Sequence, residues 1–368
     1  MNRADPRSLR AAVEAATSAD VERALASDVL SLRDYLALLS PAATRYIEPM
    51  AQRARTITLQ RFGRVIGLYA PVYVSNECTN RCAYCAFSVT NLLPRSTLNP
   101  DEALEQSDAL RRMGFQHLLL VSGESRTAVP VEYFESLLRR LRARAAYLAL
   151  EVYPLQTAEY ARLVEAGADG VTLYQETYDP EVYRTVHPAG PKADYAWRLA
   201  ALERAGDAGV ARLNVGALLG LHDWRSEGAV LGLHASWLMN RYWRSQISVS
   251  FPRLRRGPNG YGPSHPVPDT ALVQMLTAVR LLLPDAGIVL STREPAQLRD
   301  ALLPLGITQM SAGSRTEPRG YTVPCDEGAQ FDVQDRRSPL QVAEMIRKAG
   351  YEPVWKDWDR VMSRGAAA

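Results

Sequence analysis

The sequence predicts a (β/α)8 TIM-type barrel of the α/β class, and three observations lead to this fold class. Eight short apolar runs rich in β-branched residues recur after about residue 63, segments of helical period lie between them, and most runs end in polar or charged residues. Strands that alternate with helices form right-handed βαβ units and a parallel sheet, and eight such units close naturally into a barrel. An open doubly wound sheet is the alternative arrangement.

The order of elements predicts three parts. Residues 1–63 form an N-terminal helical extension, rich in Ala, Leu and Arg, with Ser18 and Ser31 as candidate N-caps. The barrel occupies residues 64–339. Residues 340–368 predict a C-terminal helix and a short aromatic tail packed on the barrel. The eight predicted strands lie within residues 64–76, 117–125, 147–154, 170–178, 212–221, 246–254, 287–295 and 307–315.

Composition narrows the class of protein. The 368 residues are 47% hydrophobic, carry a formal net charge of +3, and contain no long Lys/Arg run, so neither a nucleic-acid partner nor a membrane partner is expected. The longest apolar runs are far shorter than the ~18 residues that span a bilayer, and the charged N-terminus does not resemble a secretory signal. Four cysteines make no disulfide framework. A cytoplasmic protein is expected.

Three of the four cysteines lie within eight residues. Cys78, Cys82 and Cys85 have the spacing C-x₃-C-x₂-C directly after the first predicted strand, whereas Cys325 is far away. A structural zinc site uses four ligands, and no histidine lies near the cluster. A redox pair of Cys82 and Cys85 leaves Cys78 unexplained. A [4Fe–4S] cluster fits better, because three thiolates leave one iron open to bind and act on a substrate.

This spacing, with Tyr84 before the last cysteine, resembles the radical S-adenosylmethionine (SAM) superfamily. In that superfamily the amino and carboxylate groups of SAM chelate the open iron, and one electron splits SAM into methionine and a 5′-deoxyadenosyl radical. The resemblance implies that Cys78, Cys82 and Cys85 are the metal ligands. It also implies a [4Fe–4S] cluster and SAM as cofactors.

Other short motifs resemble SAM-binding motifs of the superfamily. "SGES" is similar to the glycine-rich motif that receives the SAM amino group, which implies roles for Gly123 and Glu124. "VGALLGLHD" is similar to the motif that packs against adenine, which implies Gly216 and Gly220. The further implied cofactor-binding residues are Tyr84, Glu151, Gln175 and Arg198. Structural alternatives are simple packing for Tyr84, a surface position for Arg198, and pairing with an arginine for Glu151.

Longer stretches resemble the aromatic amino acid lyase branch, and most closely the 2-iminoacetate synthase family, the tyrosine lyases of thiamine thiazole synthesis. They include "LYAPVYVSNECTNRCAYCAFS", "YQETYDPEVY", "LSTREP" and "PVWKDWD". The resemblance implies cleavage of the Cα–Cβ bond of L-tyrosine to 2-iminoacetate and 4-cresol, with SAM consumed. It also implies two partners, a thiazole synthase subunit that accepts the imine and a flavodoxin or ferredoxin that donates electrons.

The substrate of such a lyase is a zwitterion, and its carboxylate needs a permanent cation. Arginine offers a planar, bidentate fork for this purpose. The predicted catalytic residues are Arg293, in "STREP", and Glu176. The predicted substrate-binding residues are Arg293, Ser291, Thr292 and Arg253. A pair between Arg293 and the neighbouring Glu294 is the structural alternative.

Three other functions match parts of the pattern. The tyrosine lyase of [FeFe]-hydrogenase maturation carries a further C-terminal domain with three cysteines, whereas this sequence offers only Cys325 before it ends at Ala368. The tryptophan lyase of indolic-acid synthesis is expected to differ around the cluster and in the side-chain pocket. A non-catalytic iron–sulfur protein on a barrel scaffold leaves "SGES" and "STREP" without a purpose.

Overall fold

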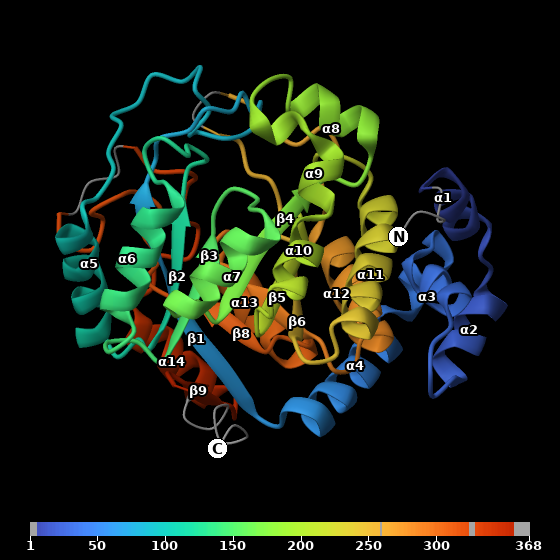
Figure 1. Cartoon of the computed structure of the whole chain (residues 1–368). Coiled ribbons are helices and arrows are strands. Elements are labelled where there is room, and N and C mark those ends of the chain that lie inside the picture. The colour runs from blue at the N-terminus through green and yellow to red at the C-terminus, as the bar shows by residue number, and fades with distance from the viewer. Residues whose placement is uncertain (1–5, 258–259, 324–327, 357–368) are drawn as a thin grey trace.

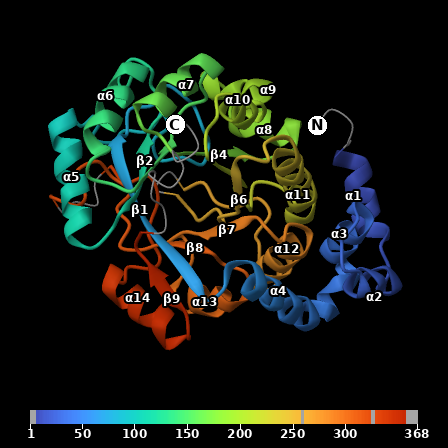
Figure 2. The same cartoon turned by 60° about the horizontal axis from the view of Figure 1, so that its bottom comes forward.

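The computed structural model describes residues 6–257, 260–323 and 328–356, and its centre is a closed barrel of parallel strands (Figures 1 and 2). Each strand pairs with the next, and β1 pairs with both β2 and β8, which closes the ring. The predicted (β/α)8 barrel is confirmed, and the open sheet is excluded. The strands are β1 (Val65–Ser75), β2 (His117–Ser122), β3 (Tyr147–Glu151), β4 (Gly170–Glu176), β5 (Arg212–Ala217), β6 (Gln246–Ser250), β7 (Gly287–Leu290) and β8 (Gln309–Ser311).

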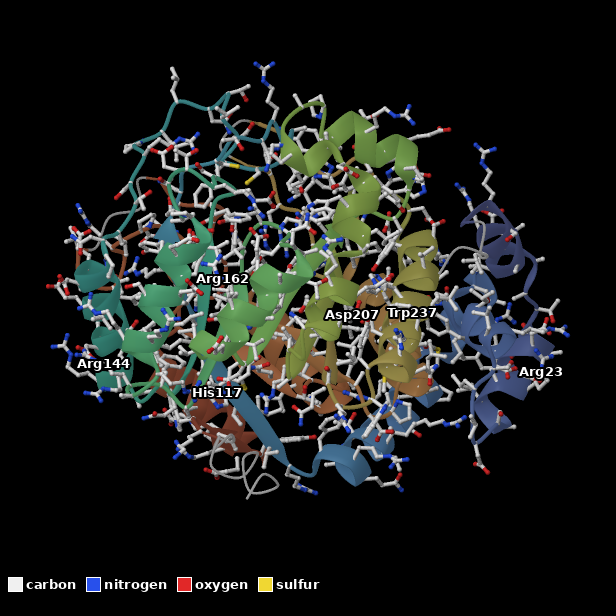
Figure 3. All side chains as sticks on the ribbon, viewed as in Figure 1. Arg23, His117, Arg144, Arg162, Asp207 and Trp237 are labelled. Atoms are coloured by element: carbon white, nitrogen blue, oxygen red, sulfur yellow. The ribbon has the colours of Figure 1, made fainter. Side chains whose placement is uncertain are left out.

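A ring of helices covers the outside of the barrel. α6 shows why they pack there, because its buried residues Val131, Phe134, Leu138 and Leu141 recur at three- and four-residue spacing on one face. On the outer surface Arg162 (Figure 3) pairs with glutamates of α6. The helices are α5 (Pro100–Arg112), α6 (Val131–Leu141), α7 (Thr157–Ala166), α10 (Ala201–Asp207), α11 (Trp224–Arg241), α12 (Asp269–Leu282) and α13 (Ala296–Leu302).

The N-terminal extension packs against the side of the barrel, next to α11 and α12 (Figure 1). Ser31 caps its helix as predicted, because its hydroxyl accepts a hydrogen bond from the Asp34 amide. The prediction for Ser18 is wrong by one residue, since Thr17 is the cap and Ser18 is the first helical residue. The helices of the extension are α1 (Pro6–Ala15), α2 (Ser18–Ala26), α3 (Leu32–Leu39) and α4 (Ile47–Phe62).

The C-terminal segment contains more structure than the predicted helix and tail. After α14 (Pro339–Lys348), the short strand β9 (Glu352–Val354) pairs in parallel with the first residues of β1. Trp355 follows it and packs edge-on against Phe115, with ring centroids 5.1 Å apart. Cys325 and the last residues of the "PVWKDWD" stretch lie outside the described residues.

The carboxyl ends of the strands form the upper end of the barrel in Figure 1, and His117 lies near the opposite, lower end (Figure 3). The long connection from β1 to α5 lies over the upper end, together with α8 (Pro180–Val186) and α9 (Tyr195–Leu199) (Figure 1). Active sites of (β/α)8 enzymes lie at this end. No helix in the part that the structure describes is long and apolar enough to cross a membrane.

Candidate active site

The three cysteines lie in the connection that follows β1, within a segment that we call the cysteine loop (residues 76–91). The side chain of Arg95 shapes this loop. Its Nη1 donates hydrogen bonds to the carbonyls of Asn76 at 2.6 Å and Phe87 at 2.9 Å, and its Nη2 donates to Ser88 at 2.8 Å. A guanidinium that binds several backbone carbonyls holds the two ends of the loop together.

All three thiols line one cavity at the upper end, which we call the cofactor cavity. Burial raises the pKa of the Cys82 and Cys85 thiols, and the positive charge of Lys192 opposes this effect. Across the described residues, no three Cys, His, Asp or Glu side chains are close enough to share a single metal ion. Thiolates that each bind a different iron need not be so close, and sulfur-only donors suit an iron–sulfur cluster. The residues therefore fit a [4Fe–4S] cluster.

Paired charges form the wall of the cofactor cavity opposite the cysteines. Glu124 accepts hydrogen bonds from Arg198 Nη1 and Asn80 Nδ2, both at 2.9 Å. Glu176 accepts one from Lys192 Nζ at 2.7 Å. Burial alone would raise the pKa of both carboxyls, but Arg198 and Lys192 outweigh it and lower the pKa of each. Both glutamates are therefore ionised and held in place before any ligand binds.

Backbone strain directs Glu176 into this wall. The residue has a φ of 72°, in the left-handed region that non-glycine residues rarely adopt, and a β-bulge interrupts the pairing of β4 with β5 there. Such strain concentrates at functional sites.

Gln175, one residue earlier, does not line the cofactor cavity or the second cavity described below. Its buried amide has no hydrogen-bond partner among the described residues. The predicted SAM contact of Gln175 gains no support from its position.

The predicted glycines serve close packing. A Cβ atom at Gly123 would overlap the carbonyl oxygen of Glu77, so only glycine lets the "SGES" segment lie against the cysteine loop. A Cβ at Gly216 would lie 2.5 Å from the Tyr174 ring. Gly220 has a φ of 111°, which side chains rarely permit. Of the three glycines, Gly123 alone lines the cofactor cavity.

A second cavity adjoins the first, and we call it the substrate cavity. It extends beneath the ends of β7 and β8, and its wall includes Tyr84, Ser291, Thr292 and Arg293. Tyr84 lines this cavity rather than the cofactor cavity. The two cavities share part of their lining. Ligands in the two cavities would therefore contact the same boundary residues. The shared residues are Cys85, Val121, Glu151, Tyr174, Glu176, Lys192 and Gln330.

Arg293 is available for an anionic ligand. Its guanidinium carbon lies 3.5 Å from the centroid of the Phe331 ring, and its side chain makes no ion pair with any described residue. The alternative pairing with Glu294 is excluded, because Glu294 binds Arg253 and Arg255 instead. The cation–π contact orients the planar guanidinium and leaves its N–H donors for a ligand.

Arg253 differs from the prediction. Its Nε donates to Glu294 at 3.0 Å, its Nη1 donates to Asp269 at 2.7 Å and to the Val267 carbonyl at 2.8 Å, and its Nη2 also binds Glu294. Arg253 is buried and does not line the substrate cavity. The structure places Arg253 in ion pairs with Glu294 and Asp269, and the predicted substrate contact of Arg253 gains no support from this position.

Sequence reasoning missed Lys192 as a site residue. Its Nζ bridges the two cavities, and its backbone amide donates to Asn80 Oδ1 at 2.8 Å. One signal was present, because only three of the 43 basic residues of the chain are lysines. Phe331 was also missed, since its segment reaches the site only through the fold.

Comparison with known proteins agrees with this geometry. The profile of the radical SAM superfamily matches residues 72–227, and that of the biotin and thiamin synthesis associated domain matches residues 250–352. The chain belongs to the radical SAM superfamily. It is 45% identical to the 2-iminoacetate synthase of Escherichia coli (strain K12) over 359 residues, which cover 97% of this chain and 95% of that protein. Within the superfamily, it belongs to the 2-iminoacetate synthase family.

Solved structures show the same fold at greater distance. HydG, a maturase of the [FeFe]-hydrogenase, matches with a TM-score of 0.88 and 30% identity, over 95% of this chain and 80% of that chain. HydG from Carboxydothermus hydrogenoformans matches with a TM-score of 0.86 and 33% identity, at the same coverage. Both sequence identities are lower than the identity to the 2-iminoacetate synthase, and the match covers a smaller share of each HydG chain.

Proposed function

We infer that this chain is a radical SAM carbon–carbon lyase that cleaves the Cα–Cβ bond of L-tyrosine. The observation that carries this conclusion is the shared boundary of the two cavities. A second ligand held by Arg293 would therefore lie beside the three-cysteine site. The membership of the chain in the 2-iminoacetate synthase family indicates that the substrate is tyrosine. The HydG structures support a hydrogenase-maturation lyase less well, because their identity and coverage are lower.

The residues of the cofactor cavity have distinct roles. Cys78, Cys82 and Cys85 would hold the [4Fe–4S] cluster, which delivers the electron that cleaves SAM reductively to methionine and a hydrogen-abstracting 5′-deoxyadenosyl group. Glu124 is the proposed partner of the SAM amino group, and Arg198 of its carboxylate. These two side chains already bind each other, so SAM would insert its own opposite charges into an existing charged set.

The residues of the substrate cavity orient tyrosine. Arg293 would bind the carboxylate with its bidentate fork, with Ser291 and Thr292 beside it. Thr292 is buried and Ser291 and Arg293 are half-buried, so bound tyrosine would displace water from around them, which protects reactive species. Removal of one hydrogen atom from the amino nitrogen lets the Cα–Cβ bond break into 2-iminoacetate and a 4-hydroxybenzyl fragment. That fragment becomes 4-cresol after it takes up one electron and one proton.

The partners and the compartment belong to the same proposal. The lyase would receive electrons from a flavodoxin or ferredoxin in the cytoplasm. It would deliver 2-iminoacetate to a thiazole synthase subunit, because a free imine hydrolyses in water. The match to a domain associated with biotin and thiamin synthesis supports a role in making the thiazole moiety of thiamine.

Product analysis tests this function. The protein is reconstituted anaerobically with iron and sulfide, reduced, and mixed with SAM and tyrosine. We expect 5′-deoxyadenosine together with 4-cresol and glyoxylate, the hydrolysis product of 2-iminoacetate. Deoxyadenosine without 4-cresol would reject tyrosine as substrate while keeping the superfamily assignment. Failure of the reduced, cluster-replete protein to cleave SAM would reject both.

A further inference from the structure

Glu151 is the last residue of β3, and it lies on the boundary between the two cavities. Its neighbours Glu124 and Glu176 are each bound by a cation. The Glu151 carboxylate, in contrast, has no hydrogen bond or ion pair with any described residue. Glu151 is half-buried and faces both cavities, so a carboxylate without a partner at this position suggests that the site keeps it for a ligand.

The surroundings of Glu151 raise the pKa of its carboxyl group to near neutral pH. Burial contributes most, and the charge of Glu176 adds to it, so the pKa of Glu151 rises to about 7, although three nearby cations lower it. A carboxyl with this pKa exchanges protons readily at physiological pH. The charged and titratable groups that act on it are Tyr69 and Tyr73 from β1, Tyr174 and Glu176 from β4, Lys192 and Arg198 from the α8–α9 region, and Arg293 after β7.

Glu151 and Arg293 form a complementary pair for an amino acid zwitterion. Both line the substrate cavity, and they carry opposite charges without a pairing contact between them. A substrate carboxylate on Arg293 would leave the ammonium group to face Glu151, at the side that borders the cofactor cavity. The amino nitrogen would then lie beside the cofactor cavity, toward which its hydrogen atom must be transferred.

The chemistry of the reaction requires a base at this nitrogen. Tyrosine enters as an ammonium, which has no lone pair. Loss of a hydrogen atom from an ammonium would give a high-energy radical cation, whereas loss from a neutral amine gives a neutral nitrogen radical that fragments easily. One proton must therefore leave the nitrogen first.

We propose that Glu151 is the general base that takes a proton from the ammonium group of bound tyrosine. This proposal rests on the proposed function. In the step, one N–H bond of the ammonium breaks, its electron pair stays on nitrogen, and the proton forms an O–H bond with the Glu151 carboxylate. Nothing is oxidised or reduced, and the carboxyl returns its proton to water after the products leave.

The variant Glu151→Gln tests the proposal, because it keeps the shape but cannot accept the proton. We expect 4-cresol formation at neutral pH to fall about 100-fold or more. Alkaline pH should partly restore it, since free amine then forms in solution. For the wild type, kcat/KM for tyrosine should rise through a pKa near that of Glu151, and the variant should lack this inflection. Glu151→Asp should retain partial activity. Glu344→Gln, an exposed site on α14, is the matched control and should change nothing.

SAM affinity separates this role from a cofactor contact. Equilibrium dialysis should give the same SAM dissociation constant for Glu151→Gln as for the wild type, within about twofold. A loss of SAM binding would overturn the proposal in favour of a cofactor-binding residue. An unchanged rate and pH profile in Glu151→Gln would also overturn it. Wild-type protein that makes no 4-cresol would instead refute the proposed function itself, so the two failures are distinct.

Discussion

The two adjoining cavities differ in how the charged side chains beyond their shared boundary are held. In the cofactor cavity, Glu124 is paired with Arg198, and Glu176 is paired with Lys192, with N–O distances of 2.9 and 2.7 Å. In the substrate cavity, Arg293 rests on an aromatic ring and has no ion pair with any described residue. The Glu124–Arg198 pair thus lies in the cofactor cavity, whereas two groups without an ion pair among the described residues are Arg293, in the substrate cavity, and Glu151, on the boundary that both cavities share.

This difference follows from what each cavity has to do. A paired network holds its side chains in fixed positions, which suits a cofactor that must chelate one iron in one geometry. A half-buried charge without an ion pair, such as that of Arg293, gains a partner when a ligand of complementary charge binds. Charges left without an ion pair in the proposed substrate cavity would therefore favour a zwitterion.

The largest effect should come from the site that both cavities depend on. Cys82→Ala removes a buried thiolate of the cluster site, so we expect loss of the visible absorption and of the bound iron after reconstitution. SAM cleavage should fall below detection. A variant that still binds four irons and cleaves SAM would show that the cysteine loop is not the cluster site.

The variant Arg293→Ala changes the substrate cavity alone. We expect kcat/KM for tyrosine to fall at least about 30-fold, equivalent to about 2 kcal/mol, because the substrate carboxylate loses its charged partner. The SAM dissociation constant, measured by equilibrium dialysis, should stay the same. If SAM binding weakened as much as tyrosine cleavage, the separation into two cavities would be incorrect.

Arg253→Gln should affect folding more than catalysis. Removing this partner of the buried Glu294 should lower the free energy of unfolding by about 3 kcal/mol, measured by denaturant titration. The KM for tyrosine should change little, because Arg253 does not line the cavity. Arg162→Ala, which breaks exposed pairs, is the control and should cost no more than about 1 kcal/mol. A large increase in KM in Arg253→Gln would restore its predicted substrate role.

The sequence predicts best what local pattern determines. All eight strands were located, because each is an apolar run followed by a helix, and barrel closure follows from their number. The cysteine loop was recognisable because its three cysteines are close in sequence. The position of Arg293 was predictable from a short motif after a strand, where side chains reach the upper end of the barrel.

The features that the sequence did not predict depend on contacts between segments that are distant in the sequence. Arg253 and Arg293 both follow strand ends, and only the fold shows that Glu294 binds Arg253 rather than its own neighbour. Lys192 reaches the site because its loop lies against Asn80, 112 positions away in the sequence. The register shift at the end of β4 separates Glu176 from Gln175, and no residue pattern signals such a bulge.

The most direct test of the central claim follows the hydrogen atom that enters 5′-deoxyadenosine. If Arg293 and the boundary residues hold tyrosine with its amino group toward the cofactor cavity, the transferred hydrogen comes from an exchangeable N–H bond. A reaction in D₂O should therefore give deoxyadenosine with deuterium from the substrate, and carbon-deuterated tyrosine in ordinary water should give none. Deuterium from a C–D bond, with none from D₂O, would contradict this placement of the substrate.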